Sequence, residues 1–278
     1  MTKMKHGVDI STHNGKLDFS KLKKAGIDFL IIRAGYGAGH IDTQAEINCK
    51  NAEQYGIPYG LYWFSYALTA DQAATEAEAC LNFAKDKRIE LPIAFDYEYE
   101  SEQHGDAAGL PPSPDLMRSM AEAFLSRIEA AGYYAILYSN VDYIKRAFAP
   151  LLTRWALWLA DWRKGKVPIH PAGYDWKIWQ TTDHATIPGL LGNFDYNLMP
   201  DDLLAVCKNL YENRRGNGQR VKNIINNLPG EWFAGYMQAA YDTLDGKYKN
   251  GSERVTRLKQ AGFDPVLVQA IVNNLLKK

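Results

Sequence analysis

The chain has 278 residues, of which 46% are hydrophobic and 23% charged, close to the averages of globular proteins. These values exclude disordered, collagen-like and low-complexity classes, and the length permits one large domain or a medium domain with a small module. No apolar run approaches the roughly 20 residues that a membrane helix needs. The three cysteines, Cys49, Cys80 and Cys207, lie far apart and are predicted to be buried thiols rather than a disulfide framework or a zinc site.

The formal net charge is zero, but the charges are unevenly distributed along the chain. Residues 1–206 hold 20 Lys and Arg against 26 Asp and Glu, which gives −6, whereas residues 207–278 hold 12 against 6, which gives +6. This asymmetry indicates two modules with different partners, although a chance distribution of surface charge gives the same totals.

Eight short apolar runs in the first 200 residues have the length and composition of strands that are buried on both faces. They are Gly7–Ile10, Phe29–Arg33, Tyr59–Phe64, Pro92–Tyr97, Tyr134–Tyr138, Ala156–Ala160, Trp176–Trp179 and Asn193–Asn197. Amphipathic stretches with capping signals lie between the earlier runs, whereas the spacers between the last three runs are predicted to be loops. The predicted helices are Asp18–Ala25, Thr43–Tyr55, Asp71–Lys87 and Asp115–Ala131.

The alternation of strands and helices predicts a parallel sheet. Eight strands within about 200 residues predict an α/β barrel of TIM type whose later helices are missing. A doubly wound open sheet is the main alternative, but the first strand has no Gly-rich turn after it.

No strand pattern continues after Asp201, and the tail is predicted to be a small bundle of three short helices. These helices are Glu231–Leu244, Ser252–Ala261 and Pro265–Leu276. The stretch 217–221 is similar to 250–255, which indicates either a degenerate repeat or a coincidence.

Acidic residues stand where the predicted strands end, which is the edge of a TIM-type barrel that carries the chemistry. Asp9 ends the first strand, and Asp96 and Glu98 end the fourth. Asp161 follows the sixth strand, and Asp195 lies within the eighth. Because unpaired carboxylates are costly to bury, their position inside apolar runs indicates a functional site.

The i, i+2 spacing of Asp96 and Glu98 places both side chains on the same face of a strand. Two close carboxylates push their pKa values apart, so one can remain a protonated acid while the other stays charged. Glycoside hydrolysis needs this division of labour. Aromatic residues near the strand ends either stack on sugar rings or belong to the core, and they are Tyr62, Trp63, Phe64, Tyr138, Trp162 and Trp179.

Other chemistries find less support in the sequence. The six histidines show no metal-ligand spacing, so no metal or other cofactor is predicted. No serine stands in a Gly-x-Ser-x-Gly elbow, so the triad of an α/β-hydrolase is not predicted either.

Eight short motifs follow one another along the first 200 residues. They are Gly7-Val8-Asp9-Ile10-Ser11, Ile31-Ile32-Arg33-Ala34-Gly35-Tyr36-Gly37, Gly60-Leu61-Tyr62-Trp63-Phe64, Asp96-Tyr97-Glu98, Tyr138-Ser139-Asn140, Leu157-Trp158-Leu159-Ala160-Asp161, Trp179-Gln180 and Asp195-Tyr196-Asn197. On these motifs, residues 6–200, about 70% of the chain, resemble glycoside hydrolase family 25, the lysozymes that cleave bacterial cell walls.

The resemblance implies a barrel of five β/α units plus three further strands. It also implies hydrolysis of the β-1,4 bond between N-acetylmuramic acid and N-acetylglucosamine in peptidoglycan. Glu98 matches the family's proton donor, and Asp9, Asp96 and Asp195 match its remaining acids, while Trp63 stands where a His is common. The residues expected to bind the substrate are Arg33, Tyr62, Phe64, Tyr138, Asn140, Asp161, Trp162, Trp179 and Gln180.

The family is described as retaining, which favours substrate assistance: Asp96 orients the 2-acetamido group of muramic acid so that its oxygen attacks. Direct attack by Asp96 or Asp195 and an inverting reaction remain the alternatives. A chitinase-like or N-acetylglucosaminidase enzyme is a further alternative, against which Asp9 and Asp195 favour the muramidase. The last alternative is a non-catalytic wall-binding protein on a decayed barrel. Such a protein would not need the four acidic residues, so their presence favours the enzyme.

The segments 246–258, 261–264 and 268–273 are similar to a choline-independent cell-wall-binding repeat. We therefore expect a muramidase barrel at 1–206, a linker or degenerate repeat at 207–228, and a wall-binding module at 229–278. Within this module Tyr248, Arg254 and Arg257 are the expected wall-binding residues, because the two arginines lie on one helical turn and can bind carboxylates through their forks. A solubilising cap is the alternative.

The segment Met1–His6 has no apolar core of the kind found in signal peptides. A lysozyme with a wall-binding tail resembles a phage endolysin, so we expect it to wait in the host cytoplasm until a holin opens the membrane, and then to act on the cell wall. Neither nucleic-acid binding nor membrane insertion is expected, and the oligomeric state is left open.

Overall fold

The computed structural model describes residues 3–163, 176–208, 210–211, 230–249 and 251–263, together with residues 265, 268, 269, 271 and 272. The chain divides into two compact units, Met1–Tyr211 and Glu212–Lys278. Of the predicted linker at 207–228, residues 207, 208, 210 and 211 belong to the described part and are helical. The rest of that segment lies outside the described residues.

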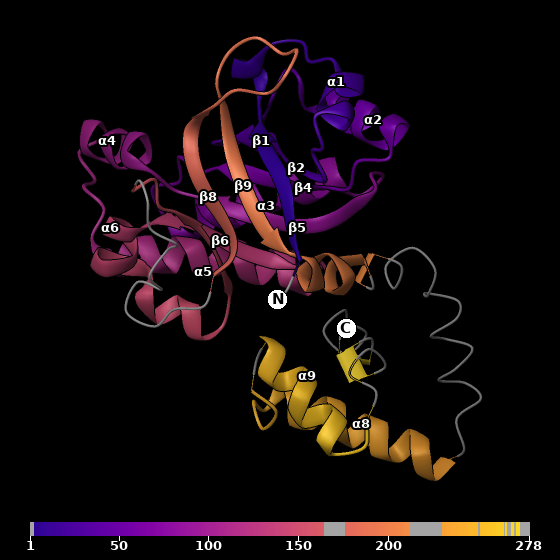
Figure 1. The fold of residues 1–278 in the computed structure, drawn as a ribbon. Coiled ribbons are helices and arrows are strands. Elements are labelled where there is room, and N and C mark those ends of the chain that lie inside the picture. The colour runs from indigo at the N-terminus through magenta and orange to yellow at the C-terminus, as the bar shows by residue number, and fades with distance from the viewer. Residues whose placement is uncertain are drawn as a thin grey trace. The chain divides into compact units, whose positions relative to one another are not determined.

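The first unit contains the barrel strands β1 (Met4–Ile10), β2 (Phe29–Tyr36), β4 (Tyr59–Phe64), β5 (Ile89–Asp96), β6 (Ala135–Asn140), β7 (Ala156–Ala160), β8 (Trp176–Ala185) and β9 (Phe194–Pro200). They pair in the order β1-β9-β8-β7-β6-β5-β4-β2, and a β1–β2 pairing closes the ring (Figure 1). The predicted eight-stranded barrel is confirmed. A further strand, β3 (His40–Ile41), pairs with the end of β2 and is too short to show a sequence pattern.

Strand β9 runs antiparallel to both of its neighbours, β8 and β1, so the expectation of a parallel sheet is wrong for this strand. The connection from β8 to β9, residues 186–193, contains no helix. A crossover that returns a strand in parallel needs a dozen or more residues, usually with a helix. Because β9 is reversed, it begins at the barrel end where the other strands finish, and Asp195 pairs directly with Asp9.

The helices of the first unit are α1 (Phe19–Lys24), α2 (Ala45–Tyr55), α3 (Ala70–Ala84), α4 (Tyr99–Ala107), α5 (Pro114–Ala130) and α6 (Val141–Tyr143). The four predicted helices are confirmed as α1, α2, α3 and α5. The side chains of Asp18, Thr69 and Ser113 accept hydrogen bonds from first-turn N–H groups and cap α1, α3 and α5. Helix α4 escaped prediction because it has no apolar stripe: its buried residues are Ser101 and Gly105.

Side chains alternate between the barrel interior and the surrounding helix layer, as the period of a strand requires. Phe29, Tyr138 and Trp158 belong to the interior cluster, whereas Trp63 packs under the helices and is fully buried. Trp63 is therefore part of the core and offers no sugar-stacking face. Gly7 makes room for the interior rings, because a Cβ at this position would lie 2.5 Å from the Phe29 ring.

The second unit contains α8 (Gly230–Leu244) and α9 (Gly251–Gln260), which confirm the first two predicted tail helices. The predicted third helix at 265–276 lies partly outside the described residues, and its described positions are helical. The core of this unit consists of Tyr236, Ala239, Ala240, Leu258, Val268, Ile271 and Val272. Across the described parts of both units, no helix is long and apolar enough to cross a bilayer.

Candidate active site

The four predicted catalytic acids lie at the same end of the barrel. Asp9 is the penultimate residue of β1, Asp96 ends β5, Glu98 follows two residues later, and Asp195 is the second residue of β9. Tyr97, between Asp96 and Glu98, packs in the outer core instead. The acids interact as one electrostatic group, because Asp195 raises the pKa values of Asp9 and Glu98, and the charge of Glu98 raises that of Asp96.

Two side-chain amides donate hydrogen bonds to the buried Asp9 carboxyl. Gln180 Nε2 lies 3.0 Å and Asn197 Nδ2 lies 2.7 Å from Asp9 Oδ2. These amides come from β8 and β9, the strands that continue the ring beyond β1 in hydrogen-bond order. Barrel closure therefore brings together groups that are 171 and 188 residues apart in sequence.

The orientation of both amides is determined by donors on their oxygen side. Gln180 Oε1 accepts from Tyr138 Oη and from Trp162 Nε1, each at 3.1 Å. Asn197 Oδ1 accepts from Trp158 Nε1 at 2.8 Å. With the oxygens occupied by donors, each amide must present its N–H group to Asp9.

The pKa of Asp9 is raised well above its ordinary value, chiefly by burial and then by the neighbouring Asp195 carboxylate, while the two amides oppose the shift. Burial also raises the pKa of Asp195, and a hydrogen bond from Asp9 opposes that rise. A hydrogen bond between two carboxyls requires a shared proton. The hydrogen bond raises the pKa of Asp9 and lowers that of Asp195, as expected if Asp9 carries the proton and Asp195 accepts the bond.

The second acidic pair, Asp96 and Glu98, has the character that an acid catalyst needs. Burial raises the pKa of Glu98 to about 7, with a further contribution from the charge of Glu100. Burial and then the charge of Glu98 raise the pKa of Asp96, and the guanidinium of Arg33 opposes that shift. A pKa of about 7 leaves Glu98 partly protonated near neutral pH, as suits a group that gives up a proton and takes it back. The hydrogen bond between the two carboxyls raises the pKa of Asp96 and lowers that of Glu98, so in the free site Asp96 is the donor of that bond.

Arg33 is held in place by Asp42, a residue that the sequence analysis did not select. Arg33 Nε donates to Asp42 Oδ2 at 2.8 Å, and the Asp42 side chain is fully buried. The same carboxylate accepts the backbone N–H groups of Thr12 at 3.0 Å and Gln44 at 2.8 Å. Asp42 thus fixes the positive charge that lowers the proton affinity of Asp96.

The remaining predicted substrate residues divide into two sets. Tyr62 lies edge-on to Trp158, at a ring distance of 6.2 Å, and belongs with Tyr138, Trp162 and Gln180 to the group around the acids. Phe64 is half-buried against another ring and makes no polar contact with the acids.

The other set consists of residues with local structural contacts. Asn140 Oδ1 accepts the backbone N–H of Tyr143 at 3.0 Å and caps α6. Arg163 pairs with the Asp161 carboxylate and holds the pKa of that group below its ordinary value. Trp179 Nε1 donates to the Asp161 carbonyl at 2.9 Å. These hydrogen bonds and the ion pair join the side chains to neighbouring structural groups and not to the four acids.

Asp42, Trp158 and Asn197 are the site residues that sequence reasoning missed. Asn197 had a usable signal, because it stands two residues after Asp195 and must share its strand face. Asp42 and Trp158 had none, because their roles depend on the chain closing into a barrel. Among the described residues, no cluster of three or more His, Cys, Asp or Glu side chains could hold a metal ion.

A closed barrel with two acidic pairs at one end has an arrangement that suits glycoside hydrolysis. Residues 8–190 match the profile of glycosyl hydrolases family 25, and the chain belongs to that family. Residues 238–276 match the CW_7 repeat. Asp195 and Asn197 lie beyond the matched segment and reach the site through β9.

Curated relatives are lysozymes. Lysozyme M1 of Streptomyces globisporus is 26% identical over 199 residues, covering 69% of this chain and 66% of the relative. The lysozyme of Streptococcus phage Cp-7 is 23% identical over 283 residues, covering 96% of this chain and 69% of the relative. The chain spans 66% and 64% of the lengths of Lysozyme M1 and the autolytic lysozyme of Clostridium acetobutylicum.

Solved structures share the barrel. The modular autolysin LytC from Streptococcus pneumoniae, in complex with a synthetic peptidoglycan ligand, has a TM-score of 0.62 at 25% identity, with 70% of this chain and 46% of that chain covered. The CTP1L endolysin has a TM-score of 0.62 at 22% identity, with 74% and 70% covered. At 22% identity, the likeness to the CTP1L endolysin shows a shared fold.

Proposed function

We propose that the chain is a lysozyme that hydrolyses the β-1,4 bond between N-acetylmuramic acid and N-acetylglucosamine in bacterial peptidoglycan. The observation that carries this function is the Glu98 carboxyl, whose pKa is raised to about 7 beside a second buried acid at the barrel mouth. Family membership and the lysozyme relatives support the same substrate class.

In the proposed reaction Glu98 donates its proton to the glycosidic oxygen as the bond to the muramic acid breaks. The 2-acetamido oxygen of the muramic acid attacks the anomeric carbon and gives an oxazolinium intermediate with retention after hydrolysis. Asp96 orients the acetamido group, and a water molecule that Glu98 deprotonates opens the intermediate. Asp9 and Asp195 stabilise the charge that develops on the sugar or its amide.

The sugar-binding residues of the proposal are the predicted set around these acids. Tyr62, Tyr138, Trp162 and Gln180 are proposed to line the sugar site. Gln180 donates to Asp9, Tyr138 and Trp162 donate to Gln180, and Tyr62 lies edge-on to Trp158. Arg33 lowers the pKa of Asp96 against the effect of burial. Phe64, Asn140, Asp161 and Trp179 belong to the proposed rim.

Mass analysis of digested peptidoglycan tests the proposed bond. A muramidase leaves muramic acid at the reducing end, whereas an N-acetylglucosaminidase leaves glucosamine there. Glucosamine ends would replace the proposal with that alternative. Intact walls after incubation with the folded protein would favour a wall-binding protein without activity.

The Asp9→Asn and Asp195→Asn variants are each expected to lower kcat by roughly 10–1,000-fold, the span typical of losing one electrostatic contact to a transition state. Asp86→Asn serves as a control, because Asp86 is exposed on the surface. The measurement is the rate of reducing-end release from soluble wall fragments. Wild-type turnover in either site variant would remove that carboxylate from the mechanism.

The second unit is proposed to bind the wall, as the CW_7 match and the +6 charge of residues 207–278 support. Of its three expected wall-binding residues, Tyr248 packs against the module core. Arg254 Nη1 donates to Gln269 Oε1 at 2.8 Å, and Arg257 Nε donates to Glu253 Oε1 at 2.9 Å. A wall carboxylate or phosphate would therefore have to compete with these partners.

Truncation after Tyr211 is expected to leave a folded barrel that cleaves soluble fragments but binds and lyses intact walls less well at physiological salt. Truncation after Asp202 should instead destabilise the barrel by at least about 2 kcal/mol, because Leu203 and Cys207 are buried in the interior cluster. Wall pelleting and thermal melts check both results. Equal wall binding with and without the second unit would contradict its proposed role.

The proposed wall-lytic barrel together with the CW_7 match also supports the role of a phage endolysin, and one relative is the lysozyme of a Streptococcus phage. In that role the chain would accumulate in the host cytoplasm and reach the wall after a holin opens the membrane. Lysis that depends on co-expression of a holin tests this route.

A further inference from the structure

The position of Glu98 depends on helix α4 rather than on a strand. Strand β5 ends at Asp96, and Glu98 is the N-cap residue of α4, with an extended backbone at φ −130° and ψ −169°. Its backbone N–H donates to Ser101 Oγ at 3.1 Å in the first turn of the helix. Because α4 buries little apolar surface, its packing alone does not explain how the Glu98 carboxyl is kept in place.

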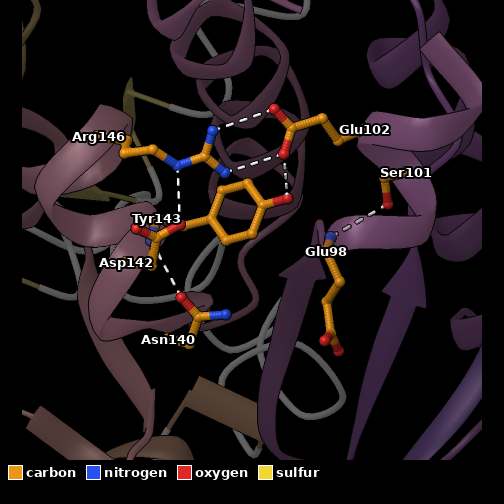
Figure 2. A network of polar contacts seen from close by, with 7 residues as sticks. All are labelled: Glu98, Ser101, Glu102, Asn140, Asp142, Tyr143 and Arg146. Atoms are coloured by element: carbon orange, nitrogen blue, oxygen red, sulfur yellow. Dashed lines mark hydrogen bonds and ion pairs between the residues drawn. The ribbon is translucent and has the colours of Figure 1, made fainter. Parts of the chain in front are cut away.

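A three-point contact on Glu102, one turn after Glu98, holds α4 (Figure 2). Arg146 Nη1 donates to Glu102 Oε1 at 3.0 Å, and Arg146 Nη2 donates to Oε2 at 2.9 Å. Tyr143 Oη donates to the same Oε2 at 2.7 Å. These donors hold the pKa of Glu102 below its ordinary value, so the carboxylate is charged and accepts all three bonds.

The other end of this network is anchored in the barrel. The Arg146 guanidinium lies 4.5 Å from the centre of the Tyr143 ring, and its Nε donates to Asp142 at 2.8 Å. Tyr143 is fully buried, and its backbone N–H is bound by Asn140 at the end of β6. The same strand carries Tyr138, whose hydroxyl group lowers the pKa of Glu98 and therefore lies near that carboxyl.

Arg146 reaches Glu102 from a π-helical turn, Ile144–Phe148, that directly follows α6. Such turns are rare and are frequent at functional sites. A single ion pair on the surface contributes little to stability. Ion pairs with a fixed, bidentate geometry contribute more, and Glu102 is bound by the Arg146 fork and by a third donor, with the Tyr143 ring beneath the guanidinium. Figure 2 shows the Glu98 carboxyl pointing away from this network, so the network does not touch the reacting groups.

We infer that Arg146 and Glu102 are positioning residues that hold the N-terminus of α4, and with it the Glu98 carboxyl, against the end of β6. This inference rests on the proposed role of Glu98 as the acid. A catalytic group displaced by about 1 Å can lose on the order of 10²-fold in rate, whereas a substrate bound mainly by other residues keeps its affinity. The expected signature is therefore a fall in kcat without a matching rise in KM.

Arg146→Met removes the fork and retains much of the aliphatic side chain. We expect its kcat on soluble wall fragments to fall about 10–100-fold, with KM within about twofold of wild type. Glu102→Gln retains the size of the side chain but removes its charge, and should give an intermediate loss of kcat. Arg146→Lys retains the charge without the fork, so its kcat should lie between those of Arg146→Met and the wild type.

Arg154→Met is the matched control. Arg154 Nη2 donates to Glu129 Oε2 at 2.8 Å, its guanidinium lies 4.2 Å from the Trp155 ring centre, and the pair has an exposure similar to that of Arg146 and Glu102. This variant loses an ion pair of similar exposure, made by a single hydrogen bond, at a helix that carries none of the four acids. Its kcat should stay within twofold of wild type even if its melting temperature falls as much as that of Arg146→Met.

Parallel assays separate the possible outcomes. A wild-type protein that releases no reducing ends would contradict the proposed hydrolase function itself. An active wild type together with an unchanged kcat in both Arg146→Met and Glu102→Gln would overturn the positioning role. An equal loss of kcat in Arg154→Met and Arg146→Met would also overturn it, because the effect would then follow stability rather than the placement of Glu98.

Discussion

The Glu98→Gln variant is expected to lose at least about 10²–10⁴-fold in kcat, the contribution of a general acid, and to lyse no cell walls on the time scale of the wild type. Glutamine has nearly the same size but carries no proton that it can transfer to the glycosidic oxygen. Release of reducing ends from soluble wall fragments measures the loss. The variant should still fold and sediment with intact walls. Activity above a few per cent of wild type would show that Glu98 is not the donor.

The raised pKa of Glu98 also predicts how activity and stability depend on pH. Because the protonated form is the active acid, kcat should fall as the pH rises through about 7. The folded state binds this proton more tightly than the unfolded chain, so ionisation of Glu98 lowers the free energy of unfolding between about pH 4.5 and about pH 7. Glu98→Gln has no such ionisation, and should melt higher than wild type at pH 8 but not at pH 4.

The Asp96→Asn variant is expected to lower kcat by about 10²–10³-fold, because it removes the carboxyl group that is proposed to orient and stabilise the attacking acetamido group. If the substrate supplies the nucleophile, a wall from which the acetyl groups have been removed should be hydrolysed much more slowly by the wild type. The residual activity of Asp96→Asn should depend little on acetylation, because orientation of the amide is already lost.

Equal wild-type rates on acetylated and de-N-acetylated walls would exclude substrate assistance. Direct attack by Asp96 or Asp195 would then be the leading alternative, and a sugar bound covalently to one of these residues would identify it by peptide mass. Product of inverted configuration at the anomeric carbon would favour a water molecule activated by a carboxylate instead.

The interior strands could be predicted from the sequence because strands that are buried on both faces consist of continuous apolar runs. Tyr59–Phe64 and Ala156–Ala160 were predicted to the residue. The run at Trp176–Trp179 was too short, since β8 continues to Ala185 through polar residues that pair with β9. That extension depends on a partner strand and leaves no mark in the hydrophobic pattern.

The candidate acids could also be predicted from neighbouring residues in the sequence. Asp96 and Glu98 stand two residues apart at the end of an apolar run, and Asp9 breaks the run of β1. The expectation that Asp96 and Glu98 share a strand face is wrong, because β5 ends at Asp96 and Glu98 begins α4. Helix α4, which carries Glu98 at its N-terminus, was not visible, because contacts of Glu102 with Tyr143 and Arg146 stabilise it instead of an apolar stripe. Those partners are 41 and 44 residues away in the chain.

By itself, the sequence determined which segments are buried and which carboxyls stand at strand ends, because both follow from the periodicity of neighbouring residues. Only the tertiary structure decided that β9 is reversed, that Asp195 faces Asp9, and that Asn197 donates to Asp9 from 188 residues away. Proton affinity depends on desolvation and on charges a few ångströms distant, and barrel closure creates both. The differences in proton affinity among the four acids are therefore a property of the closed barrel.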